Sequence, residues 1–328
     1  MMRRPTVSVL IAAHDCAPTI GRAIASALAQ PETSEIVVVD DASGDDTRAC
    51  VAGWAARDDR VRLVALETNV GPAGARNRAL KVATGEVLAL LDSDDFFAPG
   101  RLARLLAEPG WDMIADNVAF VTERGAETLD FASLPGVGRG FEAIDAASFI
   151  RGNLASAHHT RGEMGFLKPL LSRAFLLRHG LGYDGTLRLG EDYDFYVRML
   201  LAGARFRITR QAGYGAIVRS NSLSARHSTV DLGALDTAIA RHEAKADAVT
   251  KAAMRAYRAE VRAKLDHRVF LDRKAQEGLA AAMKYAMGGG GRLAAIVRGV
   301  ARDKLQPLRR DRDGLRDDGY RLLLDVAG

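Results

Sequence analysis

The sequence predicts an α/β protein built on a mostly parallel sheet, with helices on both faces and a helical extension at the C-terminus. Three observations lead to this prediction. Short apolar runs alternate with amphipathic segments through the first ninety residues, which is the pattern of repeated strand–helix units. Acidic residues directly follow two of these apolar runs, at the sheet edge where α/β proteins bind ligands. Beyond about residue 230 the chain is rich in Ala, Arg, Glu and Lys, which favour helix.

Four apolar runs are predicted to be buried strands, because they are short, rich in β-branched residues and bounded by turn residues. They cover residues 7–11, 35–39, 61–66 and 87–91. The helices expected between them cover residues 19–30, 43–57 and 75–83. Ser43 is the expected N-cap of the second helix, and residues 69–74 are expected to form a loop. This alternation predicts parallel neighbouring strands covered by helices on both faces.

The pattern is less regular from residue 111 to residue 225. There we expect a short strand at 170–171, a short helix at 174–177 and a longer helix at 191–202. The first turn of the longer helix is acidic, as the helix dipole favours. From about residue 230 the sequence predicts helices, interrupted by the four glycines at 288–291.

Charge is distributed unevenly between two predicted regions, a main domain at 1–228 and a basic helical region at 229–328. The net charge is +5, and residues 231–328 hold 20 Lys and Arg against 14 Asp and Glu, whereas the rest of the chain holds 26 against 27. A local excess of cations indicates an anionic partner, either a membrane surface or a nucleic acid.

One stretch of the basic region has the pattern of a membrane-surface helix. An apolar face is opposed by Arg298 and Arg302, and further arginines follow at 309, 310 and 312. The apolar face comprises Leu293, Ile296, Val297 and Val300. The alternative is a helix that packs on the main domain and exposes its basic face to water.

Composition excludes several other classes of protein. The only cysteines are Cys16 and Cys50, so a disulfide framework is not expected and the cytoplasm is the expected compartment. No apolar stretch is long enough to cross a bilayer. The chain has no G-x-x-x-x-G-K-[ST] motif and no G-x-G-x-x-G after the first strand, which removes the main support for P-loop and dinucleotide-binding functions.

Three carboxylates, Asp92, Asp94 and Asp95, follow the strand predicted at 87–91. Unpaired charges resist burial, so packing does not explain such a cluster. Asp92 and Asp94, with Ser93 between them, could hold a hard divalent cation against phosphate oxygens. The alternative is a solvated acidic turn, which is the commoner meaning of an isolated D-x-D.

A second acidic pair, Asp40 and Asp41, follows the strand at 35–39. A strand-end carboxylate can accept hydrogen bonds from a nucleotide base or ribose, although it can also cap a helix. Gly71 allows a ligand to approach the backbone closely, and Arg76 can pair with phosphate. The two acidic strand ends should face the same sheet edge, so a site for a nucleotide and a metal ion is expected there.

A third acidic cluster, Glu191 and Asp192, opens the helix predicted at 191–202. A carboxylate held near an acceptor hydroxyl is a candidate general base. Taken alone, the cluster is explained equally well by acidic residues that satisfy the helix dipole.

Together these motifs resemble glycosyltransferase family 2, whose members have the GT-A fold. The resemblance covers roughly residues 5 to 225, and its strength lies in the order and spacing of the motifs. It rests on Val7–Ile11, Asp40–Ser43, Asn69–Gly71, Ala75–Asn77, Gly85–Glu86, Leu91–Asp95, Pro99 and Glu191–Asp192. The segment from Gly165 to Asp192 looks most like bacterial exopolysaccharide glucosyltransferases of the succinoglycan type.

The resemblance implies a role for each site residue. Asp192 would be the catalytic base, with Glu191 beside it. Asp94 and Asp92 would hold Mn²⁺ or Mg²⁺ on the diphosphate of a UDP-sugar, and Asp41 would bind the uracil. The nucleotide would be bound by Ala12, His14, Asp41, Gly71, Arg76, Asp92, Ser93 and Asp94.

This chain departs from the family pattern after the first strand, where Ala12-Ala13-His14-Asp15 replaces the usual Pro-x-Tyr-Asn. His14 would then stack on uracil with less area than a tyrosine. Residues Arg219–Ser224 resemble a closing segment that contacts the diphosphate, and His227 is a candidate for a further metal ligand.

The predicted function is an inverting transfer of a sugar, glucose, from a UDP-sugar to a saccharide acceptor in bacterial exopolysaccharide or cell-surface polysaccharide synthesis. The acceptor is expected to be lipid-linked, the site of action the cytoplasm or the inner face of the cytoplasmic membrane, and no nucleic acid partner is expected. The alternative is a non-catalytic basic scaffold that binds anions or membranes through a similar fold. A D-x-D phosphatase is disfavoured, because Phe96 stands where that class needs Thr.

Overall fold

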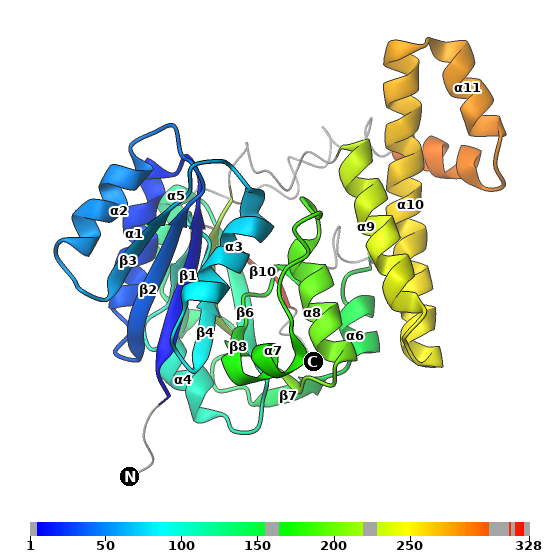
Figure 1. Cartoon of the computed structure of the whole chain (residues 1–328). Coiled ribbons are helices and arrows are strands. Elements are labelled where there is room, and N and C mark those ends of the chain that lie inside the picture. Colours follow the sequence, from blue (N-terminus) through cyan, green and yellow to red (C-terminus); the bar gives the residue numbers. More distant parts are fainter. Residues whose placement is uncertain (1–4, 155–163, 219–227, 302–314, 316–318, 325–328) are drawn as a thin grey trace.

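The computed structural model describes residues 5–154, 164–218, 228–301, 315 and 319–324 (Figure 1). Several predicted features lie outside the described residues: Arg219–Ser224, His227, Arg302, Arg309, Arg310 and Arg312.

Four parallel strands form the N-terminal half of the central sheet, in the order β3-β2-β1-β4. They are β1 (Val7–Ala13), β2 (Thr33–Asp40), β3 (Val61–Ala65) and β4 (Val87–Leu90). The helices that connect them are α1 (Ala17–Leu28), α2 (Thr47–Ala55) and α3 (Gly71–Val82). The first two lie on one face of the sheet and α3 on the other (Figure 1). The strands predicted in this half are confirmed, and the strand order reverses between β1 and β4, which is where such sheets bind ligands.

The second half of the sheet is mixed. Strand β8 (Leu170–Ser172) is antiparallel to both β4 and β6 (Met113–Val121) and so joins the two halves, while β9 (Phe206–Ile217) runs parallel to β6. Three short strands pair antiparallel with this core: β5 (Phe96–Phe97), β7 (Phe141–Ile144) and β10 (Tyr320–Leu322). The helices of this half are α4 (Arg101–Ala107), α5 (Glu123–Thr128), α6 (Ala146–Arg151), α7 (Arg173–His179) and α8 (Glu191–Leu201).

Two predicted helix starts are wrong. Ser43 does not cap α2, because its Oγ accepts a hydrogen bond from the N–H of Asp15 (3.1 Å), and the helix begins at Thr47. The predicted loop at 69–74 is largely helical, because α3 begins at Gly71 with Pro72 in its first turn, a position where proline needs no hydrogen bond. Strands β6 and β9 were not predicted. Both are apolar and largely buried, so neither shows the alternation that marks a strand with one exposed face.

The C-terminal helices pack on the main domain and share its core. They are α9 (Thr229–Glu243), α10 (Ala248–Gln276), α11 (Leu279–Met287) and a further helix whose described residues are 292–301. Buried residues of α9 and of the first half of α10 belong to the same apolar cluster as the sheet: Leu232, Leu235, Ile239, Ala253, Met254 and Val261. The predicted boundary at residue 228 therefore falls at the start of a helix that completes this core.

The chain returns to the sheet at its end. Strand β10 pairs with β6, and the Asn117 side chain forms hydrogen bonds with both the carbonyl and the N–H of Leu324 (2.8 and 2.7 Å).

The distal end of α10 carries a small helical knob, which we define as residues 279–301. It projects beyond the sheet, on the side where the parallel strands end (Figure 1). The expected apolar face at 293–300 is divided, because Ile296 is buried against Phe270 whereas Leu293 and Val297 are exposed. Within the described residues, no helix is both long enough and apolar enough to span a membrane.

Candidate functional site

The structure brings the predicted site residues to one edge of the sheet, where the parallel strands end. Ala12 lies near the end of β1 with His14 just beyond it, and Asp41 follows β2. Asp92, Ser93 and Asp94 follow β4. Glu191 and Asp192 open helix α8 and meet this edge through ion pairs described below. The arrangement follows from the topology, since parallel strands place their carboxyl ends together.

Asp41 ties the end of β2 to the start of α3. Its carboxylate is buried and accepts hydrogen bonds from the backbone N–H groups of Val70 (2.8 Å) and Gly71 (2.9 Å). Each carboxylate oxygen keeps a second acceptor position, so Asp41 can still accept a hydrogen bond from a ligand. Gly71 has a φ of 77°, a conformation that favours glycine, so its role at this position is conformational as well.

His14 is oriented by the backbone of Asp41. The carbonyl oxygen of Asp41 lies 2.9 Å from Nδ1 of His14 and can only accept, so Nδ1 carries the proton. The imidazole side chain is 45% exposed, which leaves ring surface available to a planar ligand. Fixing the ring in this way lowers the entropy that a stacking contact would cost.

The backbone at this edge is strained. Asp15 (φ 47°) and Ala42 (φ 55°) are non-glycine residues in the left-handed region, one after β1 and one after β2. The two turns are cross-linked, because Oδ1 of Asp15 accepts a hydrogen bond from the N–H of Gly44 (2.8 Å). Strain of this kind persists only where surrounding contacts enforce it, and it is concentrated at functional sites.

A cavity of about 540 Å³ lies beside the strained turns, between the loop after β2, helix α2 and residues 66 and 67. Its lining includes Ser43, Asp45, Arg48 and Glu67 but not His14 or Asp41. It therefore adjoins the predicted nucleotide site without containing its predicted base-binding residues.

Asp95 holds the acidic loop in place. Its Oδ2 accepts a hydrogen bond from the Tyr214 hydroxyl (2.8 Å), and its Oδ1 accepts one from the N–H of Ile217 (2.9 Å). The same hydroxyl accepts a hydrogen bond from the N–H of Asp92 (3.0 Å). Burial, and then the negative charges of Asp92 and Asp94, raise the pKa of Asp95 well above its usual value. The acidic loop is thus anchored to β9 and carries excess negative potential.

Ser93 faces the end of β1. Burial raises the pKa of the Cys16 thiol, and side-chain hydrogen bonds with Ser93 and Thr47 oppose that rise. Ser93 therefore links the acidic loop to the β1 edge.

Two cations join the acidic loop to helix α8. Asp92 Oδ1 lies 2.8 Å from Nη2 of Arg76, and its Oδ2 lies 2.9 Å from Nζ of Lys168. Nη1 of Arg76 lies 2.9 Å from Oε1 of Glu191, and Nζ of Lys168 lies 2.8 Å from Oδ2 of Asp192. Both cations are buried. Arg76 thus lies at the predicted site, but its guanidinium is bound to carboxylates.

The charges of this cluster stabilise one another. Burial acts to raise the pKa of Asp92, but Lys168 and Arg76 outweigh it and hold that pKa well below its usual value. Burial acts to lower the pKa of Lys168, but Asp192 and Asp92 outweigh it, so that pKa is raised. Burial, and then the charge of Asp192, raise the pKa of Glu191.

Asp192 is the carboxylate with an unused oxygen. The residue is only 9% exposed, and its Oδ1 has no hydrogen-bond partner, although Nη1 of Arg76 lies 3.4 Å away. Buried polar atoms without partners are uncommon and are frequent at functional sites. An oxygen in this position is able to accept a proton from a bound hydroxyl group.

Sequence reasoning missed Lys168 and Tyr183. The Tyr183 ring lies 5.5 Å from the guanidinium carbon of Arg76, and its backbone is held by both amide atoms of Asn77 (2.7 and 2.9 Å). Burial, and then the carboxylate of Asp192, raise the pKa of its hydroxyl well above the usual value. No local pattern identifies either residue, because their partners are distant in the sequence.

The donor set is suited to a divalent metal only if the substrate supplies ligands. Among the described residues, no three His, Cys, Asp or Glu side chains come together as a metal site. Mg²⁺ is commonly bound by one or two carboxylates together with substrate phosphates. Both oxygens of Asp92 are engaged by cations, so Asp94 is better placed to be a direct ligand. The raised pKa of Asp95 shows that the loop has negative charge for a cation to neutralise.

Comparisons with known proteins were made against families, sequences and structures. The model described as glycosyl transferase family 2 matches residues 8–140. The succinoglycan biosynthesis protein ExoU of Rhizobium meliloti (strain 1021) is 45% identical over 312 residues, covering 92% of this chain and 89% of the relative. The UDP-Glc:alpha-D-GlcNAc-diphosphoundecaprenol beta-1,3-glucosyltransferase WfgD of Escherichia coli is 36% identical over 116 residues, covering 35% and 44%.

Among solved structures, S. aureus TarS 1-349 in complex with UDP-GlcNAc has a TM-score of 0.59 at 21% identity, covering 89% of this chain and 83% of that one. The likeness concerns the fold, and it confirms the fold class predicted from the sequence.

Proposed function

Since this chain belongs to glycosyl transferase family 2, we propose that it transfers glucose from a UDP-sugar to a saccharide acceptor and inverts the anomeric carbon. The observation that carries the proposal is the unpartnered Oδ1 of Asp192, buried at the start of α8 and linked through Lys168 to the acidic loop. That arrangement places a general base beside a site for a nucleotide diphosphate.

In the proposed reaction, Oδ1 of Asp192 accepts the proton of the acceptor hydroxyl as its oxygen attacks the anomeric carbon. The bond from that carbon to the diphosphate breaks, and UDP leaves with the electron pair. A single displacement inverts the configuration, so no covalent nucleophile is needed. Glu191 supports the site by binding Arg76. Mn²⁺ or Mg²⁺, held by Asp94 with Asp92 nearby, would neutralise charge on the departing diphosphate.

The nucleotide is proposed to bind along the edge formed by β1, β2 and α3. His14 would stack on the uracil, Asp41 would accept its N–H, and Ala12 and Gly71 would allow close approach of the backbone. Ser93 and Arg76 would line the diphosphate side. The oriented imidazole of His14 and the remaining acceptor positions of Asp41 support this placement.

The acceptor is proposed to be a lipid-linked saccharide, and the pathway the synthesis of an exopolysaccharide or another cell-surface polysaccharide at the cytoplasmic face of the membrane. ExoU is named for succinoglycan biosynthesis, and WfgD is named for an acceptor on diphosphoundecaprenol. The knob at 279–301 is the proposed membrane contact, because it exposes apolar side chains in a basic region. These are Leu279, Met283, Met287, Leu293 and Val297.

Thermal-shift measurements with nucleotides test the donor assignment. We expect UDP to stabilise the protein, ADP and GDP to do so much less, and Mn²⁺ or Mg²⁺ to increase the effect of UDP. The Asp94→Asn variant should lose the metal-dependent part, because that carboxylate is the proposed direct ligand. Equal stabilisation by all three diphosphates, or none by any, would favour the non-catalytic scaffold instead.

A further inference from the structure

The ammonium group of Lys168 lies between two carboxylates that have different proposed roles. It is 2.9 Å from Oδ2 of Asp92 in the acidic loop and 2.8 Å from Oδ2 of Asp192 at the start of α8. Lys168 is only 6% exposed, so both contacts are made away from bulk water. We propose that Lys168 is the positioning residue for the base: it holds Oδ2 of Asp192 so that Oδ1 faces the acceptor hydroxyl. This inference rests on the proposed function.

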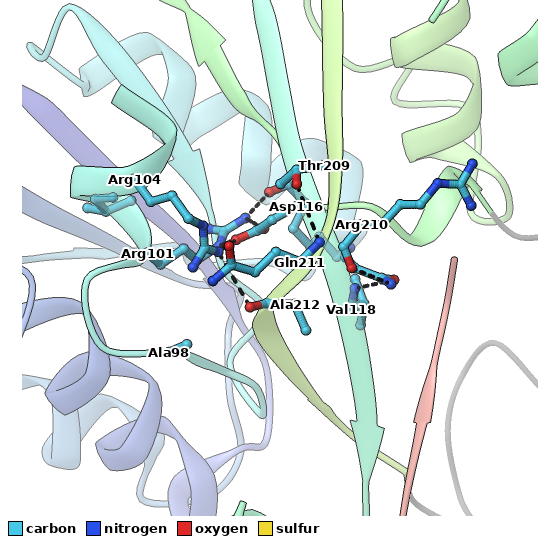
Figure 2. A network of polar contacts seen from close by, with 12 residues as sticks. Ala98, Arg101, Arg104, Asp116, Val118, Thr209, Arg210, Gln211 and Ala212 are labelled. Atoms are coloured by element: carbon cyan, nitrogen blue, oxygen red, sulfur yellow. Dashed lines mark hydrogen bonds and ion pairs between the residues drawn. The ribbon is translucent and has the colours of Figure 1, made fainter. Parts of the chain in front are cut away.

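The backbone of Lys168 is itself fixed by a buried ion pair. Its carbonyl oxygen accepts a hydrogen bond from Nη2 of Arg101 (2.6 Å), and Arg101 pairs with Asp116 (2.8 Å). Both Arg101 and Asp116 are fully buried. Figure 2 shows Arg101 and Arg104 converging on Asp116 beside β9. A lysine normally loses much side-chain entropy when it is fixed, and here the surrounding ion pair fixes its origin.

Aromatic rings hold the Arg101 guanidinium from its faces. Its central carbon lies 4.6 Å from the centre of the Phe97 ring and 5.4 Å from that of Tyr214. Tyr214 also anchors Asp95 of the acidic loop. The contacts that set the place of Lys168 therefore also set the place of the acidic loop, so the distance between donor site and base is defined by one rigid unit.

The two carboxylates depend on Lys168 to different degrees. Asp92 keeps a second close cation, because Nη2 of Arg76 lies 2.8 Å from its Oδ1. Asp192 keeps only a longer contact with Arg76, at 3.4 Å and without a hydrogen bond. Removal of Lys168 should therefore displace Asp192 more than Asp92. A displacement of about 1 Å in a reacting group can cost about a hundredfold in rate.

The test is the Lys168→Met variant of the full-length protein, with UDP affinity in Mn²⁺ and turnover measured on the same preparation. We expect kcat to fall about a hundredfold. UDP affinity should change by less than about tenfold, which corresponds to about 1.4 kcal/mol. Lys168→Gln, which keeps length and hydrogen-bond donors but no charge, is the second variant if the first fails to fold. Arg104→Met is the matched control, since it removes a cation from buried Asp116 without touching Asp192.

Comparison with Asp192→Asn separates this inference from the proposed function. If Asp192→Asn retains turnover, the base assignment itself fails. If Asp192→Asn is inactive, the double variant with Lys168→Met should be no slower than Asp192→Asn alone, because the lysine acts through that carboxylate. The inference is overturned if the lysine variant keeps normal kcat, if it loses UDP affinity more than kcat, or if Arg104→Met lowers kcat equally.

Discussion

At the residue scale, neighbouring carboxylates of one loop have different environments. Asp92 is held ionised by two cations, whereas Asp95 is buried, hydrogen-bonded to β9 and has a raised pKa. Asp94 is half-buried between them. Environments that separate the pKa values of adjacent acids also separate their roles. We therefore assign metal binding mainly to Asp94, structural support to Asp95, and the link to the base to Asp92.

Replacement of the proposed base tests the assignment at this scale. Asp192→Asn should lower transfer to the acceptor by at least about a hundredfold, the low end for loss of a general base. Steady-state transfer assays check the rate, and calorimetry should show nearly unchanged UDP binding in Mn²⁺, because Asp192 is not a proposed nucleotide contact.

Asp194→Asn serves as the control for Asp192→Asn. Asp194 is buried in the same helix turn but pairs with Arg198 and His242, so its loss should reduce stability more than turnover. Nearly normal turnover of Asp192→Asn would transfer the role of base to Glu191.

At the scale of elements, helix α9 braces the start of the helix that carries the base. His242 of α9 lies 2.6 Å from the carboxylate of Asp194 in α8, and Tyr193 of α8 is in ring contact with Tyr257 of α10 at 4.4 Å between centres. Gly190, the N-cap of α8, has a φ of 71°, and a Cβ there would lie 3.0 Å from Leu235 of α9. The position of Asp192 is thus set from outside the sheet as well as from within it.

Gly190→Ala should disturb this brace. Both the left-handed backbone, which costs about 1–2 kcal/mol for a non-glycine residue, and the contact with Leu235 should displace the first turn of α8. We expect a lower melting temperature and a lower kcat. Gly180→Ala is the matched control, because Gly180 is also left-handed (φ 60°) but has open space around it. It should lose similar stability and keep kcat; equal losses of kcat would argue against the brace.

Sequence reasoning succeeded where structure is local and failed where it is not. The strands that carry Asp41 and Asp92 were readable as apolar runs, and their parallel pairing then placed both residues at one edge. Lys168 could not be predicted, because its partners Asp92 and Asp192 are 76 and 24 residues away. The start of α3 was misplaced for the same reason, since Asp41 supplies the acceptor for its first N–H groups from another strand.

At the scale of the whole molecule, the C-terminal helices contribute to the core of the main domain. A chain that ends at Ser228 would lose the buried side chains of α9 and α10, among them Leu232, Leu235 and Met254. Loss of each large buried side chain costs about 2–5 kcal/mol, against a typical total stability of about 5–15 kcal/mol. We expect the truncated protein not to unfold cooperatively in calorimetry. A cooperative transition near that of the full chain would show that residues 1–228 form an independent domain.

The proposed membrane contact is better tested by substitution than by truncation. Met283→Glu with Met287→Glu changes two exposed side chains of the knob and should weaken binding to anionic vesicles at least about tenfold, since burial of one such side chain contributes about 1.5–3 kcal/mol. Co-sedimentation at low and high salt measures it, and exposed Val230→Glu on α9 is the control. If neither the native nor the substituted protein binds vesicles, the knob is a structural cap on α10.

The pairing of the last strand with β6 has a consequence for how the protein is made. Asn117 and Leu324, which bond to each other, are separated by 207 residues. At a synthesis rate of about 5–20 residues per second, the two are made about 10–40 seconds apart. During that interval, the edge of β6 at Ala119–Val121 has no β10 to pair with, and unpaired strand edges promote association between chains. Completion of the sheet therefore depends on the final residues, and the nascent chain is most exposed to misassembly just before synthesis ends.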